Sequence, residues 1–429
     1  MNYSEALEFL FSQFPSYHNI GKAAYRSDLK NIILLDNYFK NPHNRFLTVH
    51  VAGTNGKGSV SHMIASVLQE AGYKTGLFTS PHLKDFRERI RVDGEMIPET
   101  NVVTFVTNHN EIIKEIKPSF FEMTVAMAFN YFAECKVDVA VIEVGLGGRL
   151  DSTNIISPVL SVITNIGHDH MDILGDTLEK IAFEKAGIIK EKIPVIISET
   201  QPETENVFLR KAGDLNAPIF FADRIFSCRL SKSEIINKER NFLITELSTG
   251  NEFAGITALS GNYQAKNLIA VFAAISLLKK VFNISKENIS EGIRKVILNT
   301  GLAGRWQILG KSPLTICDTG HNKEGLEYVI GQLENIQKSA LHMVIGFVND
   351  KDLQSVLPLF PKDALYYFTK ASIPRALNES ILKSEAAKYG LKGESFPDVQ
   401  SALNAARNEA KPTDLIFVGG STFVVAEVI

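Results

Sequence analysis

The sequence has little cysteine, little net charge and no long apolar run. Its 429 residues include three cysteines, Cys135, Cys228 and Cys317, which lie far apart and match neither a disulfide framework nor a zinc-binding spacing. The formal net charge is -3 and no long basic run is present, so bulk charge attracts neither nucleic acid nor an anionic membrane. No stretch approaches the roughly 18 apolar residues that a transmembrane helix needs. We therefore expect neither a nucleic-acid partner nor a membrane partner.

The N-terminus also lacks the features of a secretion signal. The segment "MNYSEALEFLFSQF" has acidic residues among its apolar ones and no basic start. The composition, 45% hydrophobic and 22% charged, is that of an ordinary globular protein. We expect a cytoplasmic protein with reduced, structural cysteines. A chain of this length exceeds what one hydrophobic core usually serves, so about two or three domains are expected.

Short apolar runs alternate with helical patterns along the first half of the chain. The runs are "RFLTVHVAG", "KTGLFTSPH", "VDVAVIEVG", "LSVITNIGHDH" and "IPVII". Nearly continuous Val, Ile and Leu runs separated by helices are typical of a parallel sheet covered on both faces. After the first run, Val60, Ile64 and Val67 belong to an apolar stripe with helical spacing, which ends before Gly72. The fold class predicted is therefore α/β.

The second half of the chain repeats the alternation after an irregular region. Residues 201–260 contain alternating pieces such as "NFLITEL" and are predicted, loosely, to be rich in β-structure. A helical pattern follows at 267–281, and residues 299–313, rich in glycine and turn residues, are interpreted as a hinge. The runs "LTICDTG", "LHMVIGF", "LYYFTKA" and "DLIFVGG" then predict a second α/β domain from about residue 300.

The segment "HVAGTNGKGSVSHM", residues 50–63, nearly matches a phosphate-binding loop. The strict pattern G-x-x-x-x-G-K-[ST] requires a glycine where Val51 stands and a hydroxyl directly after Lys57, where Gly58 stands. A glycine turn between a strand and a helix offers backbone N–H groups and the positive end of a helix dipole to a phosphate. A phosphate-binding loop and a simple tight turn therefore both remain open.

Polar residues end two further strands of the predicted sheet. Glu143 ends an apolar strand, where a carboxylate would serve either by holding Mg²⁺ or by pairing with nearby Arg149. His168 and His170 follow the next strand and are either metal ligands or solvated loop residues. Ligands of open parallel sheets bind at the carboxyl ends of the strands, which is where these residues are expected.

Lys185 lies on the apolar stripe of a predicted helix. Asp176 and Glu179 are predicted to cap that helix at its N-terminus, and Ile181 shares the stripe with the lysine. Either the lysine snorkels toward solvent along its apolar stem, or it is a functional group that faces the strand ends. The pattern alone does not separate these two interpretations.

Nine strings together carry a family resemblance. In order along the chain they are "HVAGTNGKGS", "TSPHL", "ERIRVDGE", "VIEVGLGGRLDSTN", "HDHMDILG", "EKAGI", "AGRWQI", "CDTGHN" and "VGGSTFVV". With them the chain resembles the folylpolyglutamate synthase/dihydrofolate synthase family, a branch of the ATP-dependent Mur ligases. The loop of that family is GTNGKGS, so the offset hydroxyl is normal there.

The resemblance implies a function and a domain organisation. The function is that of an ATP-dependent ligase, which adds L-glutamate through an acyl phosphate to a folate-type carboxylate, that of dihydropteroate, of tetrahydrofolate polyglutamate or of both. ATP and Mg²⁺ are the implied cofactors, and a monomer is expected. Residues 1–298 would form the P-loop-containing, parallel-sheet ATPase domain, and residues 299–429 a smaller, Rossmann-like α/β glutamate-ligase domain.

The resemblance also implies roles for individual residues. Those around the ATP phosphates would be Thr54, Asn55, Gly56 and Lys57, and the nucleotide site would be completed by Asn267, Arg305 and Asp318. Magnesium would be ligated by Ser80, Glu143 and His170, and Lys185 would be carbamylated by CO₂. The pterin-bearing substrate would meet Ser119, Phe120, Phe121 and Glu122, with both phenylalanines as stacking surfaces, and also Leu150, Asp151 and Ser152. His321 would lie near the incoming glutamate.

The chain departs from the usual family pattern in places. Tyr263 replaces the histidine of "HQxxN", Ala303 replaces the proline of "PGR", and Lys323 replaces the proline of "AHNP". The N-terminal substrate loop would be the segment "YRSDLKN", residues 25–31. The alternative functions are a Mur-type peptidoglycan amino-acid ligase, a regulatory P-loop ATPase and a non-catalytic binding protein.

Overall fold

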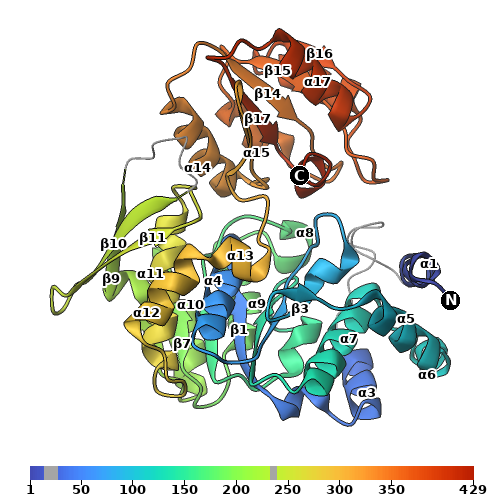
Figure 1. The fold of residues 1–429 in the computed structure, drawn as a ribbon, viewed down its shortest axis with the longest axis vertical. Coiled ribbons are helices and arrows are strands. Elements are labelled where there is room, and N and C mark those ends of the chain that lie inside the picture. Colours follow the sequence, from blue (N-terminus) through green and yellow to red (C-terminus); the bar gives the residue numbers. More distant parts are fainter. Residues whose placement is uncertain (14–27, 232–238) are drawn as a thin grey trace. The chain divides into compact units, whose positions relative to one another are not determined.

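The computed structural model describes residues 1–13, 28–231 and 239–429 as two compact units (Figure 1). In their described parts, the first unit comprises Met1–Arg229, Asn241–Thr257 and Ala265–Gly301, and the second comprises Leu230–Arg240, Ala258–Gln264 and Leu302–Ile429. The predicted division at residues 298/299 does not foresee the two short segments that join the second unit. Residues 25–27 of the predicted N-terminal substrate loop lie outside the described residues.

The first unit is built on an eight-stranded sheet with the order β4-β3-β2-β5-β1-β6-β7-β8. Its strands are β1 Leu47–Ala52, β2 Thr75–Phe78, β3 Ile90–Val92, β4 Glu95–Met96, β5 Val139–Glu143, β6 Leu160–Ile163, β7 Val195–Ile197 and β8 Ile219–Phe221. Six strands, β2, β5, β1, β6, β7 and β8, run parallel, and β3 and β4 add an antiparallel edge. Each of the five apolar runs predicted as strands contains one, so the parallel sheet is confirmed.

Helices cover both faces of this sheet. They are α1 Tyr3–Gln13, α3 Lys30–Tyr38, α4 Lys57–Glu70, α5 Glu99–Asn108, α6 Asn110–Ile116, α7 Phe120–Cys135, α8 Met171–Leu174, α9 Leu178–Lys185, α10 Pro202–Asp214, α11 Gln264–Leu278, α12 Lys286–Arg294 and α13 Val296–Thr300. Ala140 and Ile142 of β5 join the core cluster that contains α7. Because side chains alternate between the faces of a strand, Val139 and Val141 face the other side, and α4, which also contacts β5, covers that side.

The loosely predicted β-rich region, 201–260, is partly wrong. Residues 202–214 form helix α10, which begins with proline at its first turn and buries Thr204, Phe208 and Ala212 at a spacing of four residues. That spacing is a helical signal, but it is weak because the other residues of the stretch are mostly polar. The remainder does contain β8 and a separate three-stranded sheet of β9 Phe226–Leu230, β10 Arg240–Glu246 and β11 Glu252–Thr257.

The second unit contains a six-stranded mixed sheet with the order β12-β13-β17-β14-β15-β16. Its strands are β12 Gln307–Lys311, β13 Leu314–Cys317, β14 Leu341–Ile345, β15 Leu365–Phe368, β16 Gly393–Ser395 and β17 Leu415–Gly419. Its helices are α14 Lys323–Glu334, α15 Leu353–Val356, α16 Glu379–Ala387, α17 Val399–Glu409 and α18 Thr422–Ala426. The four predicted strands are confirmed, but the segment interpreted as a hinge, 299–313, contains β12, which pairs antiparallel with β13.

The core of the second unit explains why its central strands appear in the sequence as continuous apolar runs. Ile316 and Phe417 belong to one hydrophobic cluster, whereas their neighbours Cys317 and Ile416 belong to another. Alternate residues of the same strand thus pack on opposite faces, so every position of a central strand is apolar. Among the residues that the structure describes, no helix is both long enough and apolar enough to cross a membrane.

Candidate active site

The phosphate-loop segment connects β1 to α4 in a conformation that requires glycine. Gly53 and Gly56 have φ angles of +144° and +86°, which side chains rarely tolerate. A Cβ atom at Gly53 would lie 1.8 Å from the hydroxyl of Thr164, and one at Gly56 would lie 2.3 Å from Oδ1 of Asn267. The loop therefore packs closely against the end of β6 and against α11, which brings Asn267 to the loop, and the predicted role of Asn267 in the nucleotide site stays a prediction.

Two residues after β6 hold this loop in place. Asn165 accepts from the backbone N–H of Thr54 through its carbonyl and from that of Asn55 through its side chain, both at 2.8 Å. The hydroxyl of Thr164 donates to the carbonyl of Asn55 at 2.6 Å. Neither residue is among the predicted site residues, although polar side chains directly after a parallel strand are a signal for a site at that edge.

Lys57 and Lys185 meet at one backbone carbonyl. The Nζ atom of Lys57 donates to the carbonyls of Gly53 and Thr54 at 3.1 and 3.2 Å. The Nζ atom of Lys185, which is 132 residues away from Gly53 in sequence, donates to the Gly53 carbonyl at 2.8 Å. Two lysine amines are thus directed at the phosphate loop from two different helices.

Lys185 does not snorkel. Its side chain is buried, with 4% of its surface exposed, so that interpretation is wrong. Burial, and after it the charge of Lys57, lower the pKa of Lys185 to about 7. A substantial fraction of this amine is therefore neutral near neutral pH, which is the form that reacts with CO₂. The predicted capping of its helix is also corrected: Thr177 accepts from Lys180 N as the N-cap, and Asp176 instead pairs with the Lys180 side chain.

Glu143 lies at the edge of the sheet beside Ser80. The parallel register that pairs Phe78 with Ile142 brings the ends of β2 and β5 together, and Ser80 N donates to Glu143 Oε2 at 3.1 Å. The carboxylate is 4% exposed. The proposed pairing of Glu143 with Arg149 is wrong, because Arg149 forms its ion pair with Glu184, with the nitrogen and oxygen 2.9 Å apart.

His170 follows β6 at the same edge of the sheet. It adopts a left-handed backbone conformation with φ of +52°, and its N–H donates to Asp169 Oδ1 at 3.1 Å. No group of three or more His, Cys, Asp or Glu side chains able to hold a metal occurs in the described part of the chain. The predicted set would not form such a group, because Ser80 would contribute a hydroxyl, so its role as a metal site stays a prediction. His168 lies in the same loop, and neither of its two interpretations is tested.

The first predicted substrate segment begins a helix. Ser119 is the N-cap of α7, and its hydroxyl accepts from Glu122 N at 3.2 Å while Ser119 N donates to Glu122 Oε2 at 2.6 Å. This reciprocal pair is a capping box, whose S-x-x-E signature before an apolar run was readable in the sequence. The two side chains thus have a local structural role, and their contact with a substrate stays a prediction.

The two predicted stacking residues differ in their surroundings. Phe120 is 4% exposed; Phe11 of α1 stacks on its ring at 4.9 Å between centroids, and the Arg89 guanidinium lies 5.4 Å from the ring centroid. Phe121 is only partly buried and lies against Gly145, where a Cβ atom would come within 2.4 Å of its ring. Of the two rings, Phe121 is the one with exposed surface to offer a ligand.

The second predicted substrate segment follows β5. Leu150 is partly exposed, whereas Asp151 and Ser152 are buried. Asp151 Oδ2 accepts from Leu146 N at 2.8 Å, and its Oδ1 accepts from Thr153 N at 3.0 Å. Burial raises the pKa of the Asp151 carboxyl, and these hydrogen bonds oppose that shift.

The remaining predicted residues, Arg305, Asp318 and His321, belong to the second unit. Asp318 Oδ2 accepts from the Tyr263 hydroxyl at 2.6 Å and from Trp306 N at 2.7 Å. Burial raises the pKa of Asp318, while the hydrogen bond from Tyr263 and the charge of Arg305 oppose that shift. Tyr263, a departure from the family pattern, therefore bonds directly to a predicted nucleotide residue. His321 Nδ1 donates to the Thr319 carbonyl at 3.0 Å, which fixes the proton on that nitrogen.

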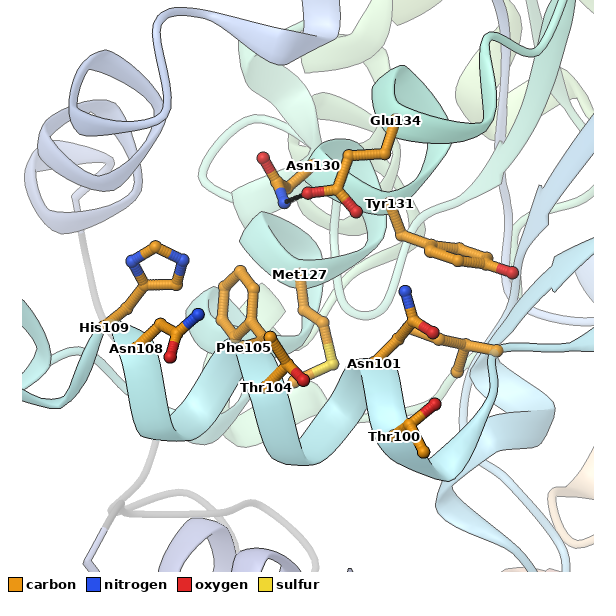
Figure 2. Close-up of a pocket in the computed structure, with 11 residues that line it drawn as sticks. Thr100, Asn101, Thr104, Phe105, Asn108, His109, Met127, Asn130, Tyr131 and Glu134 are labelled. Atoms are coloured by element: carbon orange, nitrogen blue, oxygen red, sulfur yellow. Dashed lines mark hydrogen bonds between the residues drawn. The ribbon is translucent and has the colours of Figure 1, made fainter.

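A cavity of about 180 Å³ lies between α5 and α7. Figure 2 shows Phe105 and Met127 beside Asn101 and Asn130, and Asn130 Nδ2 donates to Glu134 Oε1 at 2.7 Å. None of the residues that line this cavity is among the predicted site residues. The candidate active site is instead the edge of the sheet at the phosphate loop, where Lys57, Lys185 and Glu143 lie.

Comparisons with known proteins identify the family of the chain. The chain matches the model of the Mur ligase middle domain over residues 51–275 and that of the Mur ligase, glutamate ligase domain over residues 304–422. It is 35% identical over 402 residues to the dihydrofolate synthase/folylpolyglutamate synthase of Bacillus subtilis, which covers 90% of each chain. The chain belongs to the folylpolyglutamate synthase/dihydrofolate synthase family of Mur ligases. It is an ATP-dependent ligase, as its motifs predicted.

Further relatives of this ligase support the family and the fold. A probable bifunctional folylpolyglutamate synthase/dihydropteroate synthase of Haloferax volcanii is 34% identical over 435 residues, and the chain spans 50% of that relative's length. FolC of Escherichia coli, solved in complex with DHPP and ADP, has a TM-score of 0.85 and 27% identity and covers 100% of this chain and 97% of its own. A bifunctional folylpolyglutamate synthase/dihydrofolate synthase with Mn, AMPPNP and L-glutamate bound has a TM-score of 0.84 and 26% identity, with the same coverage. The α/β fold class is confirmed.

Proposed function

We propose that this ligase joins the amine of L-glutamate to the carboxylate of a folate-type acceptor, which is dihydropteroate, tetrahydrofolate polyglutamate or both, and consumes ATP. The observation that carries the proposal is the convergence of Lys57 and Lys185 on the Gly53 carbonyl of a glycine-shaped loop. The ligands of the relatives, DHPP with ADP and AMPPNP with Mn and L-glutamate, belong to the same substrate classes.

The residues at the sheet edge fit a magnesium ion by the chemistry of their donors. Mg²⁺ prefers oxygen ligands, keeps several waters and is bound through one or two carboxylates together with substrate phosphates. Glu143 and Ser80 supply a carboxylate and a hydroxyl at adjoining strand ends. His170 follows β6 at the same edge of the sheet. These three residues would hold the ion, which when bound neutralises charge on the transferring phosphoryl group.

Lys185 would carry a carbamate. Its buried amine, with a pKa lowered to about 7, can take up CO₂ by losing a proton and forming an N–C bond. The product is an anion, which would suit a position beside a cationic metal site and beside Lys57. The burial of this amine and its proximity to Lys57 support the carbamate.

The reaction needs an activated acceptor, because a carboxylate does not acylate an amine unaided. An acceptor carboxylate oxygen attacks the γ-phosphorus of ATP, the bond to ADP breaks, and an acyl phosphate forms. The amine of glutamate then attacks the acyl carbon, loses a proton and expels inorganic phosphate. Phosphoryl transfer is catalysed mainly by positioning and charge neutralisation, for which Lys57, the phosphate loop and Arg305 are the proposed groups.

The remaining predicted residues would complete the substrate sites. Asn267, which packs on Gly56, and Asp318 would contact the nucleotide, while the acceptor would meet Phe121, Leu150 and the segment around Ser119. His321 would lie near glutamate, carried by a domain of residues 299–429 that acts with an ATP-binding domain of residues 1–298. We further propose that the enzyme is cytoplasmic and monomeric, and sedimentation of the purified enzyme at working concentration would test the monomer.

Isotopic labelling of the acceptor tests the proposed reaction. With ¹⁸O in the acceptor carboxylate, one labelled oxygen should appear in inorganic phosphate for each amide formed, because that oxygen bridges carbon and phosphorus in the intermediate. A phosphatase or nucleotide switch would take the oxygen from water and leave the acceptor intact. Amide accumulation without label in phosphate would contradict the acyl-phosphate route, and a UDP-muramyl acceptor is the control for a peptidoglycan ligase.

A further inference from the structure

A histidine lies fully buried in the central strand of the first sheet. His50 of β1 has 0% of its surface exposed and stands among apolar strand residues. A buried polar side chain lowers stability unless it is hydrogen-bonded, and a valine or isoleucine would fill such a position without that cost. Hydrogen bonds of the imidazole must therefore offset the cost of burying it.

The imidazole begins a chain of hydrogen bonds that leads to the second substrate segment. His50 Nε2 lies 2.9 Å from the hydroxyl oxygen of Thr153, and that hydroxyl lies 2.5 Å from Oδ1 of Asp151. A carboxylate oxygen accepts, so the hydroxyl proton goes to Asp151. The hydroxyl oxygen must then accept from His50, which assigns the imidazole proton to Nε2.

The imidazole of His50 is neutral, so the hydrogen bonds from His50 to Thr153 and on to Asp151 keep the same donors and acceptors. Burial, and secondarily the charge of Lys190, lower the pKa of His50 to about 3. Lys190 itself donates to the carbonyl of Asn154 at 2.8 Å, and Asn154 Nδ2 donates to the carbonyls of Arg149 and Gly187 at 3.1 and 3.0 Å. The backbone before and after Asp151, at Arg149 and Asn154, is thus also held by hydrogen bonds.

The hydrogen-bond chain joins parts of the protein that are far apart in sequence, since 103 residues separate His50 from Thr153. Consecutive hydrogen bonds polarise one another, so each strengthens the next. Asp151 also accepts from the backbone of Leu146 and of Thr153. Three hydrogen bonds thus hold the Asp151 carboxylate, and they fix the backbone of the turn, including Leu150 and Ser152 on either side of Asp151.

We propose that His50 is a positioning residue for acceptor binding, acting through Thr153 and Asp151 to fix the backbone of Leu150–Ser152. The inference rests on the proposed function, in which that segment contacts the pterin-bearing acceptor. It predicts that the relay affects the acceptor and not the nucleotide, even though His50 lies only three residues before Gly53 in the chain.

Matched substitutions at Thr153 separate a positioning role from a structural one. Thr153→Ser keeps the hydroxyl and Thr153→Val keeps the shape, so only the valine variant breaks both bonds of the relay. Loss of a hydrogen bond to a charged group typically weakens an interaction by about tenfold or more. We expect Thr153→Val to raise KM for dihydropteroate or tetrahydrofolate about tenfold while KM for ATP stays at the wild-type value, and Thr153→Ser to resemble wild type.

Variants at His50 and a direct structural readout complete the test. His50→Gln places an amide donor near the Nε2 position and should keep most acceptor affinity, whereas His50→Phe should raise the acceptor KM as Thr153→Val does. The effects of His50→Phe and Thr153→Val should not add in the double variant, because both break one relay. In ¹⁵N-histidine NMR, wild type should show the Nε2–H tautomer, with its resonance shifted in Thr153→Val.

The outcomes distinguish this proposal from the proposed function. An acceptor KM unchanged in a folded Thr153→Val or His50→Phe variant, an equal rise in the KM for ATP, or full additivity would overturn the positioning role alone. If the wild-type enzyme formed no amide with either acceptor, the proposed function would fail and the positioning role would fail with it. Should Thr153→Val not fold, His50→Phe compared with His50→Gln decides the question by the same measurements.

Discussion

Lys57 and Lys185 donate to the same oxygen atom, the carbonyl of Gly53, at 3.1 and 2.8 Å. Two ammonium groups at one acceptor repel each other, and the more deeply buried of the two loses its proton more easily. The structure therefore separates their roles: Lys57, at the start of α4, is suited to neutralise phosphate charge, and Lys185 is suited to react as a neutral amine.

Replacing Lys57 should abolish most of the turnover. Lys57→Ala removes a preorganised cation from the phosphate loop, and the loss of one such group typically lowers kcat by about 10² to 10³. Steady-state kinetics of amide formation measures the effect, and Lys180→Ala, on the exposed side of α9, is the matched control. Near-normal turnover of a folded Lys57→Ala variant would remove the assignment.

Depleting CO₂ should lower activity reversibly. Because a carbamate forms only on the neutral amine, and the pKa of Lys185 is lowered to about 7, its formation should weaken as the pH falls below about 7. Activity measured in CO₂-depleted buffer should fall and should return on addition of bicarbonate, more completely at pH 8 than at pH 6. Activity indifferent to CO₂ at both pH values would contradict the carbamate.

The buried amine also makes stability depend on pH. The pKa of Lys185 is about 7 in the folded protein and near the ordinary 10.5 when unfolded, so between these values the unfolded chain binds more protons and stability rises with pH. Below about pH 7 both states are protonated and the cost of burying the charge is fully present. Lys185→Met lacks this cost. In CO₂-free buffer its Tm should therefore exceed that of wild type by roughly a few degrees at pH 6, and the difference should shrink toward pH 10. A constant difference would mean that Lys185 does not titrate in this range.

Removing the charge of Glu143 should alter the magnesium dependence of the reaction. Glu143→Gln keeps the size of the side chain but replaces a ligand of charge -1, and we expect the magnesium concentration for half-maximal activity to rise by more than about tenfold. Titration with MgCl₂ measures this. Arg149→Gln removes the ion pair with Glu184 and the guanidinium contact with the Phe183 ring but no predicted metal ligand, so it should follow the wild-type curve. Glu143→Gln would do the same if Glu143 had no metal role.

A methyl group at Gly145 should disturb acceptor binding specifically. Its Cβ atom would lie 2.4 Å from the ring of Phe121, so Gly145→Ala should displace that ring and raise the acceptor KM several-fold, with little change in the KM for ATP. Gly213→Ala in α10, where a Cβ atom meets nothing within 4 Å, should keep wild-type kinetics and gain roughly 0.5–1 kcal/mol of stability from helix propensity. Equal KM values in both variants would exclude Phe121 from the acceptor site.

Features encoded by neighbouring residues were predictable from the sequence. The strand, glycine turn and helix around Lys57 follow from an apolar run, Gly53 and Gly56, and a stripe of helical spacing, all within about 25 residues of sequence. The order of the family motifs predicted the ligase and its ATP chemistry, and the apolar runs predicted the parallel strands of both sheets. The capping box of Ser119 and Glu122 was equally local and could have been predicted, because its residues are three positions apart.

Only the tertiary structure decided which distant groups meet. Whether Glu143 pairs with Arg149 or Lys185 snorkels depends on the order in which strands and helices pack, and no spacing along the chain contains that order. Packing brought Arg149 to Glu184 and Lys185 to Gly53. It also joined His50 to Asp151 through Thr153, because the parallel pairing of β1 with β5 places the turn after β5 beside the buried face of β1. Long-range contacts of this kind arise from burial summed over a whole core, and so they could not be predicted from any single segment of the sequence.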